Sequence, residues 1–320
     1  MAAQNQLLDA DQIPAIFRDD HIIRGYRKPG LTVIQCIKSM LQMNNETVNF
    51  WTHMIPFLYF LIRFYTIDQQ YQLVEDPFYW PLLCYIVGSS YPLFSCIAHA
   101  LNCMSESARH ICFFLDYASI SLYSFTCAIA YFYYLRPVTF FTMDWYITLS
   151  SMMAICCCLT SCISRLYAHT SRPYIYRTLA FALQWVYVNS MLAYRIFSCH
   201  HHQCRLTSDY YHTMQFVMAI LVAIFMTSKF PECVWPTSFD ICGQSHHWFH
   251  IFVCVGHRYQ LDGILNDIQQ RQHVIRLIKP TFSSTLGVLF VVIACNSIIV
   301  IYFSYLIIRR SNRAKQVKST

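Results

Sequence analysis

Eight long apolar stretches are the feature of this sequence that most limits its fold. Each is close to the roughly 20 residues that an α-helix needs to cross the hydrocarbon core of a bilayer. Short polar connections separate them, and no internal repeat is visible. We therefore predict an all-α integral membrane protein, a seven-helix bundle with an eighth transmembrane helix. The predicted spans lie at about 49–67, 80–102, 115–135, 145–164, 179–197, 210–228, 245–265 and 283–308.

The composition supports this class and argues against several others. Hydrophobic residues make up 56% of the chain and charged residues 12%, whereas a soluble domain carries about 25% charged residues. The 7 glycines are too few to favour Rossmann or P-loop nucleotide sites. The net charge of +7 comes from basic residues beside apolar runs, which is typical of membrane flanks and argues against a nucleic-acid partner.

The cysteines do not form the pattern of a secreted disulfide scaffold. There are 16, and most lie inside apolar segments, where cysteine behaves as a small buried hydrophobe. Only Cys199 and Cys204, which flank a polar loop, are candidates for a disulfide. No signal-peptide pattern precedes the first apolar stretch, so we expect that stretch to direct insertion.

Basic residues divide the chain and orient it. We distinguish a basic arm, 1–45, a transmembrane bundle, 46–308, and a basic tail, 309–320. Within the arm, Leu31–Met43 has the mixed pattern of a short amphipathic helix on the membrane surface. Because arm and tail are both rich in Lys and Arg, the positive-inside rule predicts that both termini are cytoplasmic. The sequon at Asn45 is then expected to carry no glycan.

Histidines from separate predicted helices converge at the cytoplasmic end of the bundle. His99 lies near the inner end of the second span, and His246 and His250 open the seventh. Residues four apart share one helix face, and three imidazoles with one open position are typical of catalytic zinc. Asp116, at the inner start of the third span, is predicted to hold a metal-bound water. Ser95, one turn before His99, is predicted to orient that imidazole.

The other polar residues predicted near these histidines can each be interpreted in two ways. The alternative to a metal site is a set of hydrogen bonds between helices. Asp240 either caps the seventh span or joins the site, and capping is the preferred reading. A face formed by Glu46, Asn49 and His53 either starts the first span or forms a polar cover beside the metal. A second candidate metal group, which we favour less, consists of the loop residues His200, His201 and His202 with His212.

These motifs resemble those of the progestin and adipoQ receptor family, and within it the membrane progestin receptor branch, most of all the gamma type. The resemblance covers about residues 13–270 and follows family order from the first span to the seventh. Two departures stand out: Trp235–Ser238 replaces the usual Gly-Arg before Phe239-Asp240, and His247 stands where Gln is usual. The matching motifs are Glu46-x-x-Asn49-x-x-x-His53, Ser95-x-x-x-His99, Leu115-Asp116-Tyr117 and Ser245-His246-x-x-x-His250.

The resemblance implies a bundle of the adiponectin-receptor and ceramidase type with zinc held by His99, His246 and His250. It implies a steroid (progestin) receptor of the plasma membrane that gives rapid, non-genomic responses, with G proteins as signalling partners. The alternative is a zinc-dependent intramembrane hydrolase of lipid amides such as ceramide, with or without steroid gating. A third reading is a scaffold in which zinc only joins helices. No ligand-contacting residue and no oligomeric state are predicted.

Overall fold

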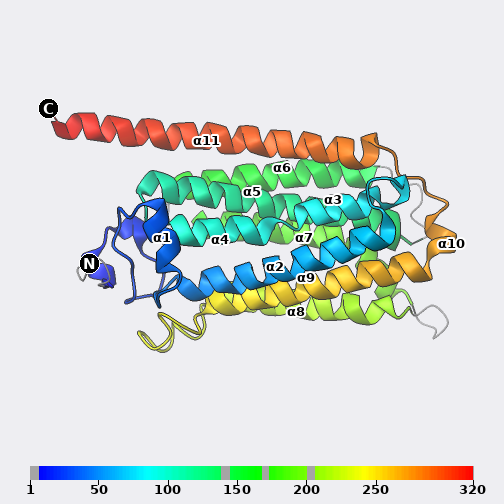
Figure 1. Ribbon diagram of the computed structural model, residues 1–320, viewed down its shortest axis with the longest axis horizontal. Helices are drawn as coiled ribbons and strands as arrows, with labels where there is room; N and C mark the ends of the chain where they lie inside the picture. The colour runs from blue at the N-terminus through cyan, green and yellow to red at the C-terminus, as the bar shows by residue number, and fades with distance from the viewer. Residues whose placement is uncertain (1–6, 138–144, 168–172, 200–205, 320) are drawn as a thin grey trace.

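The computed structural model describes residues 7–137, 145–167, 173–199 and 206–319. Within these residues all regular structure is helical. The long helices lie side by side as one elongated bundle, with the N-terminal arm at one end (Figure 1). We call this the arm end and the other the far end. The main helices are α2 (Thr47–Tyr71), α3 (Trp80–Gly88), α4 (Tyr91–Leu101), α5 (Glu106–Ala130), α6 (Trp145–Leu166), α7 (Pro173–Phe197), α8 (Ser208–Ser228), α9 (Ser245–Gln270) and α11 (Val288–Ser319).

Short elements complete the chain. The arm holds single turns at Ala10–Gln12 and Ala15–Phe17 and the helix α1 (Val33–Ser39). α1 lies within the segment predicted as an amphipathic helix and begins with a capping box at Thr32. A turn at Pro77–Tyr79 leads into α3, a π turn at Tyr131–Leu135 extends α5, α10 covers Gln272–Ile275, and a π turn at Ser283–Gly287 opens α11.

The second predicted span is two helices rather than one. α3 ends at Gly88, and α4 starts at Tyr91 with proline at its second position. Pro92 has no N–H to donate to the carbonyl of Gly88, and its ring crowds that carbonyl, which interrupts the helical hydrogen bonding at this point. The break leaves Ser95 and His99 on a separate short helix that ends at Leu101.

Among the described residues, five helical segments are long and apolar enough to cross a membrane, by length and composition alone. They are Pro77–Leu101, Glu106–Leu135, Trp145–Leu166, Ser208–Ser228 and Ser283–Arg313. The other three predicted spans form α2, α7 and α9, which are equally long but more polar. Their polar residues include His53, Gln184 and His257, all buried inside the bundle. Others, such as Arg63 and Arg258, are partly or largely exposed and pair with Asp262.

α5 is the centre of the bundle. It contacts α3, α4, α6, α7 and α11, while α8 packs on α9 and α9 on α2. Gly88 allows the close approach of α3 to α5, because a Cβ there would stand 1.9 Å from Oγ1 of Thr126. Buried aromatic residues from these helices, such as Tyr85, Phe125 and Tyr131, form the main core. This packing brings α4, α5 and α9 together at the arm end, where the histidines lie.

Candidate metal centre

Three histidines from two helices meet at the arm end of the bundle. The ligand nitrogens of His99, His246 and His250 all lie within 4.8 Å of one another. Nε2 of His99 is 3.4 Å from Nε2 of His246. Two nitrogens that each lie ~2.0–2.1 Å from one tetrahedral zinc are about 3.3–3.4 Å apart. The spacing of this pair therefore suits a shared metal ion.

The imidazole of His99 is oriented by Glu46. Its Nδ1 lies 2.7 Å from Oε2 of Glu46, and both side chains are buried. A carboxylate at Nδ1 fixes the proton there and leaves Nε2 free as a ligand. The same carboxylate accepts hydrogen bonds from the side-chain amides of Asn49, at 2.9 Å, and Asn102. Glu46 thus ties α2 to α4 directly behind the histidine group.

The hydrogen bonds around Glu46 continue to Arg27 of the arm. The amide of Asn102 donates to Glu46, and its Oδ1 accepts from the guanidinium of Arg27 at 2.7 Å. The guanidinium of Arg27 is itself buried and donates to the carbonyl of His99 at 2.7 Å and to the carbonyl of Ala100 at 2.7 Å. The N-terminal arm therefore anchors the end of α4 that carries His99.

His250 is oriented through its Nδ1 as well. That nitrogen lies 3.2 Å from the carbonyl of Asn49 and 3.0 Å from Oγ1 of Thr52, which leaves Nε2 for a metal. The ring of His53 stacks on that of His250 with 3.8 Å between centroids. The predicted polar face of α2 therefore lies against the histidine group: Glu46 contacts His99, while Asn49 and His53 contact His250.

Asp116 contributes a buried carboxylate on α5. It is 7% exposed, and its Oδ1 has no hydrogen-bond partner among the described residues. An unpaired buried carboxylate oxygen is costly unless something further binds it. Oδ1 of Asp116 can therefore accept a hydrogen bond from a water or a ligand that enters the bundle. The chemistry open to the three histidines is metal binding by neutral imidazoles, with Asp116 on α5, a helix that packs against α4.

Two of the predicted roles meet different contacts in the structure. In the part of the chain that the structure describes, Nδ1 of His99 donates its hydrogen bond to the carboxylate of Glu46, and no hydrogen bond joins Ser95 to that ring. Ser95 is buried on α4, and its role stays a prediction. The capping role of Asp240 is wrong, because α9 begins after Gln244. Oδ2 of Asp240 instead accepts from the backbone N–H groups of Ile23 and Arg24, at 3.2 and 2.8 Å.

Glu232 is a buried residue that holds the start of α9 in place, and it is not among the predicted site residues. Its Oε2 accepts a hydrogen bond from the backbone N–H of Ser245 at 2.7 Å, and its Oε1 accepts one from the hydroxyl of Ser245. Glu232 therefore supports the first turn of α9, next to His246. The sequence does not reveal how the segment between Glu232 and α9 turns, so no rule based on residue spacing would have found this contact.

His247, which follows His246 in the chain, accepts a hydrogen bond from the N–H of Gly243 at 3.0 Å. It is not part of the three-histidine group.

The second candidate metal group does not assemble from the residues that can be described. His200, His201 and His202 lie outside the described residues. His212 is buried at the far end of the bundle, with Nε2 2.8 Å from Oδ2 of Asp267. Arg195 also binds Asp267 at 2.9 Å. Cys199 is disulfide-bonded, and its predicted partner Cys204 lies outside the described residues.

The chain was also compared with known proteins. A model of the family described as haemolysin-III related matches residues 41–261. The human membrane progestin receptor gamma is 35% identical over 310 residues, covering 93% of each chain. The human membrane progestin receptor delta is 34% identical over 318 residues, with 95% of this chain and 92% of that protein covered. A membrane progestin receptor alpha from Cynoscion nebulosus is 27% identical over 91% of this chain and 84% of its own.

Proposed function

Since the chain belongs to the haemolysin-III-related family and matches membrane progestin receptors over most of its length, we propose that it is a steroid receptor of the plasma membrane. A progestin is its proposed ligand, and a zinc ion held by His99, His246 and His250 is its proposed cofactor. The single observation that carries the metal proposal is the convergence of those three ligand nitrogens within 4.8 Å. The receptor proposal rests on the full-length similarity.

The donor set fits zinc better than a hard cation. Imidazole nitrogens suit Zn²⁺, whereas Ca²⁺ and Mg²⁺ prefer oxygen ligands. Glu46 behind His99 and the Asn49 carbonyl behind His250 are the outer partners that such a site needs. A bound zinc would supply Lewis acidity and a permanent link between α4 and α9.

The surroundings of the site suggest how a change within the bundle would reach its surface. Arg27 binds the end of α4 beside His99, and Asp240 binds the arm at Ile23 and Arg24. A shift of α4 against α9 would therefore disturb the arm directly. We propose that the arm carries the response to ligand, in a rapid non-genomic pathway in which G proteins are candidate partners.

Binding of labelled progesterone to the purified full chain tests the receptor proposal. We expect saturable binding that unlabelled progestin displaces, and weaker binding by the double variant H246A/H250A. Loss of the two imidazoles removes the link between α4 and α9, which should loosen the bundle around a ligand. A folded wild-type protein that binds no progestin specifically would contradict the proposal.

A second function, hydrolysis of a lipid amide such as ceramide, is favoured by Asp116. Its unpaired buried oxygen is suited to hold the water that a zinc site uses for hydrolysis. If this reading holds, Asp116→Asn should keep zinc and folding but reduce turnover by ~100-fold or more, the size of a general acid–base contribution. If the wild-type protein binds zinc but hydrolyses no sphingolipid amide, the hydrolase proposal is contradicted. Asp116 would then have a structural or ligand-binding role.

A further inference from the structure

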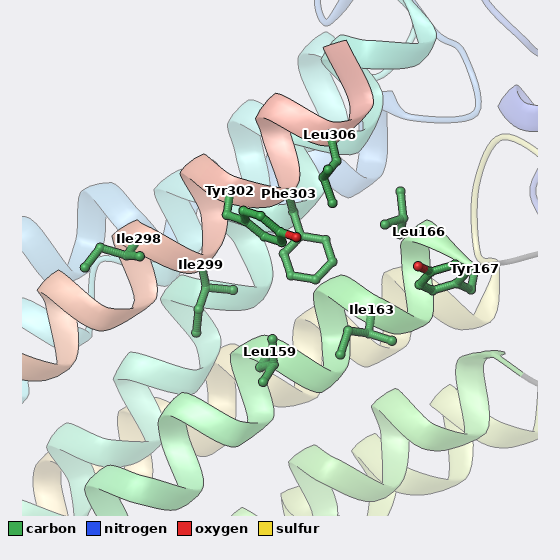
Figure 2. A pocket seen from close by; sticks show the side chains of 9 residues that line it. All are labelled: Leu159, Ile163, Leu166, Tyr167, Ile298, Ile299, Tyr302, Phe303 and Leu306. Carbon is green, nitrogen blue, oxygen red and sulfur yellow. The ribbon is translucent and has the colours of Figure 1, made fainter. Parts of the chain in front are cut away.

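A groove on the outside of the bundle, between α6 and α11, is not explained by the histidine group. Figure 2 shows the side chains of both helices around it. The hollow measures about 420 Å³ and is lined by Leu159, Ile163 and Leu166 of α6 and by Ile298, Phe303 and Leu306 of α11, among others. A volume of this size lies within the roughly 300–1,000 Å³ of small-molecule sites.

The groove has a buried floor and an open, apolar rim. Leu166 and Phe303 are each 5% exposed, whereas Ile163 is 41% and Ile298 66% exposed. The helices α6 and α11 contact each other along this face. Because both are apolar enough to cross a membrane, the groove would open to the acyl chains of the bilayer and not to water.

A positive charge stands at the arm end of this groove. Tyr167 lines the groove, and Cζ of Arg310 lies 5.7 Å from the centroid of its ring. Positions 299, 303, 306 and 310 repeat at helical spacing, so Arg310 continues the stripe of α11 that lines the hollow. Arg309 and Arg313 stand in the same turns of α11.

None of these three arginines forms an ion pair with a described residue of the chain, and all three are exposed. The fold thus leaves a cluster of uncompensated cations where the apolar groove ends. At a rise of 1.5 Å per residue, the helix from Ile298 to Arg310 is roughly 18 Å long, close to the ~15 Å of one leaflet of hydrocarbon. An amphiphile with one acyl chain and an anionic head matches both features.

We propose that the groove between α6 and α11 is a binding site for an anionic phospholipid. One acyl chain lies along Ile163, Ile298 and Phe303, and the phosphate lies against Arg310, with Arg309 and Arg313 close by. A neutral steroid would use the apolar wall but not the arginines, and a free phosphate would use the arginines but not the wall. The site is separate from the three-histidine group and independent of the proposed receptor function.

Lipid retention by the full chain, measured by native mass spectrometry from a neutral detergent, tests this site. The probes are phosphatidylserine and phosphatidylcholine with identical acyl chains. We expect wild-type protein to retain phosphatidylserine preferentially. Arg310→Gln should weaken phosphatidylserine binding about fivefold, the effect of one basic residue near an anionic membrane surface. Lys279→Gln, which removes an exposed charge at the far end of the bundle, should leave the preference unchanged.

A matched pair of tryptophan variants tests the groove itself. Ile298 and Ile301 are 66% and 67% exposed on α11, but only Ile298 lines the groove. Ile298→Trp should therefore reduce retention of the acyl chain, and Ile301→Trp should not. Equal retention of both lipids by wild type, equal effects of the two tryptophans, displacement of phosphatidylserine by cholesterol, or equally tight binding of inorganic phosphate would each overturn the proposal.

Discussion

At the scale of single residues, the histidine group was within reach of sequence reasoning, but the residues that orient it were only partly so. The spacing of His246 and His250 places them on one helix face, and the alternation of spans brings His99 to the same depth. Glu46 was assigned to the same region, yet its contact with His99 joins positions 53 apart. Helical periodicity relates residues within one helix and does not say which of several polar residues on a neighbour will touch the ring.

The role of Glu46 can be tested by removing its charge with little change of shape. Glu46→Gln keeps an acceptor for Nδ1 of His99 but lowers the basicity of the ring. We expect zinc affinity, measured by competition with a chelator, to fall about 10- to 100-fold, as is typical for outer partners of metal-binding histidines. Glu106→Gln, an exposed glutamate at the start of α5, should bind zinc as wild type does. Unchanged affinity in Glu46→Gln would mean that the carboxylate serves the fold alone.

At the scale of elements, length and apolar content predicted where the long helices lie but not their interruptions or caps. The break between α3 and α4 falls at Pro92, whereas α2 continues through Pro56. Neither mean hydropathy nor the presence of a proline therefore predicts where a long helix is interrupted. The start of α9 at Ser245 agrees with the predicted span, but the capping role of Asp240 is wrong. The backbone N–H of Ser245 instead donates to Glu232, which the turns of 229–244 bring back to the helix. α2, α7 and α9 are less apolar than membrane helices usually are, because they carry buried polar residues such as His53, Gln184 and His257 and also exposed ones such as Arg258.

The contact of α3 with α5 depends on the absence of a side chain at position 88. Gly88→Ala would place its Cβ 1.9 Å from Oγ1 of Thr126, so one helix must move. We expect a loss of stability of ~1–3 kcal/mol, the usual range for overpacking, seen as earlier thermal unfolding in detergent. Adding Thr126→Ala should recover part of this loss, because it removes the hydroxyl and methyl groups that collide. If the effects of the two substitutions on stability simply add, the Gly88–Thr126 contact is not the cause of the loss of stability in Gly88→Ala.

At the scale of the whole molecule, the arm, the bundle and the last helix form one connected structure with its proposed site at one end. The bundle that the apolar stretches predict is present, with α11 packed on α5 and α6 as an eighth long helix. The sequence also predicts that both termini face the cytoplasm, since arm and tail hold most of the basic residues. The helical packing itself is compatible with either orientation, because packing contacts do not depend on which face of the membrane is inside.

Epitope tags at the two ends of the full chain test that orientation in intact cells. We expect both tags to be inaccessible to antibody until the plasma membrane is permeabilised, because an even number of crossings returns the chain to the side on which it started. A tag inserted next to 200–205, in the predicted outer loop, should be accessible without permeabilisation. Access to only one terminus would require an odd number of crossings and would remove α11 or another long helix from the membrane.

The most direct test of the account is the metal content of the purified full chain, for wild type and the double variant H246A/H250A. The convergence of His99, His246 and His250 predicts about one zinc per wild-type chain and none retained by the folded variant. A folded wild-type protein without zinc, even after addition of the metal, would contradict the account. The three histidines would then be polar residues that hold α4 and α9 together, and the receptor proposal would rest on similarity alone.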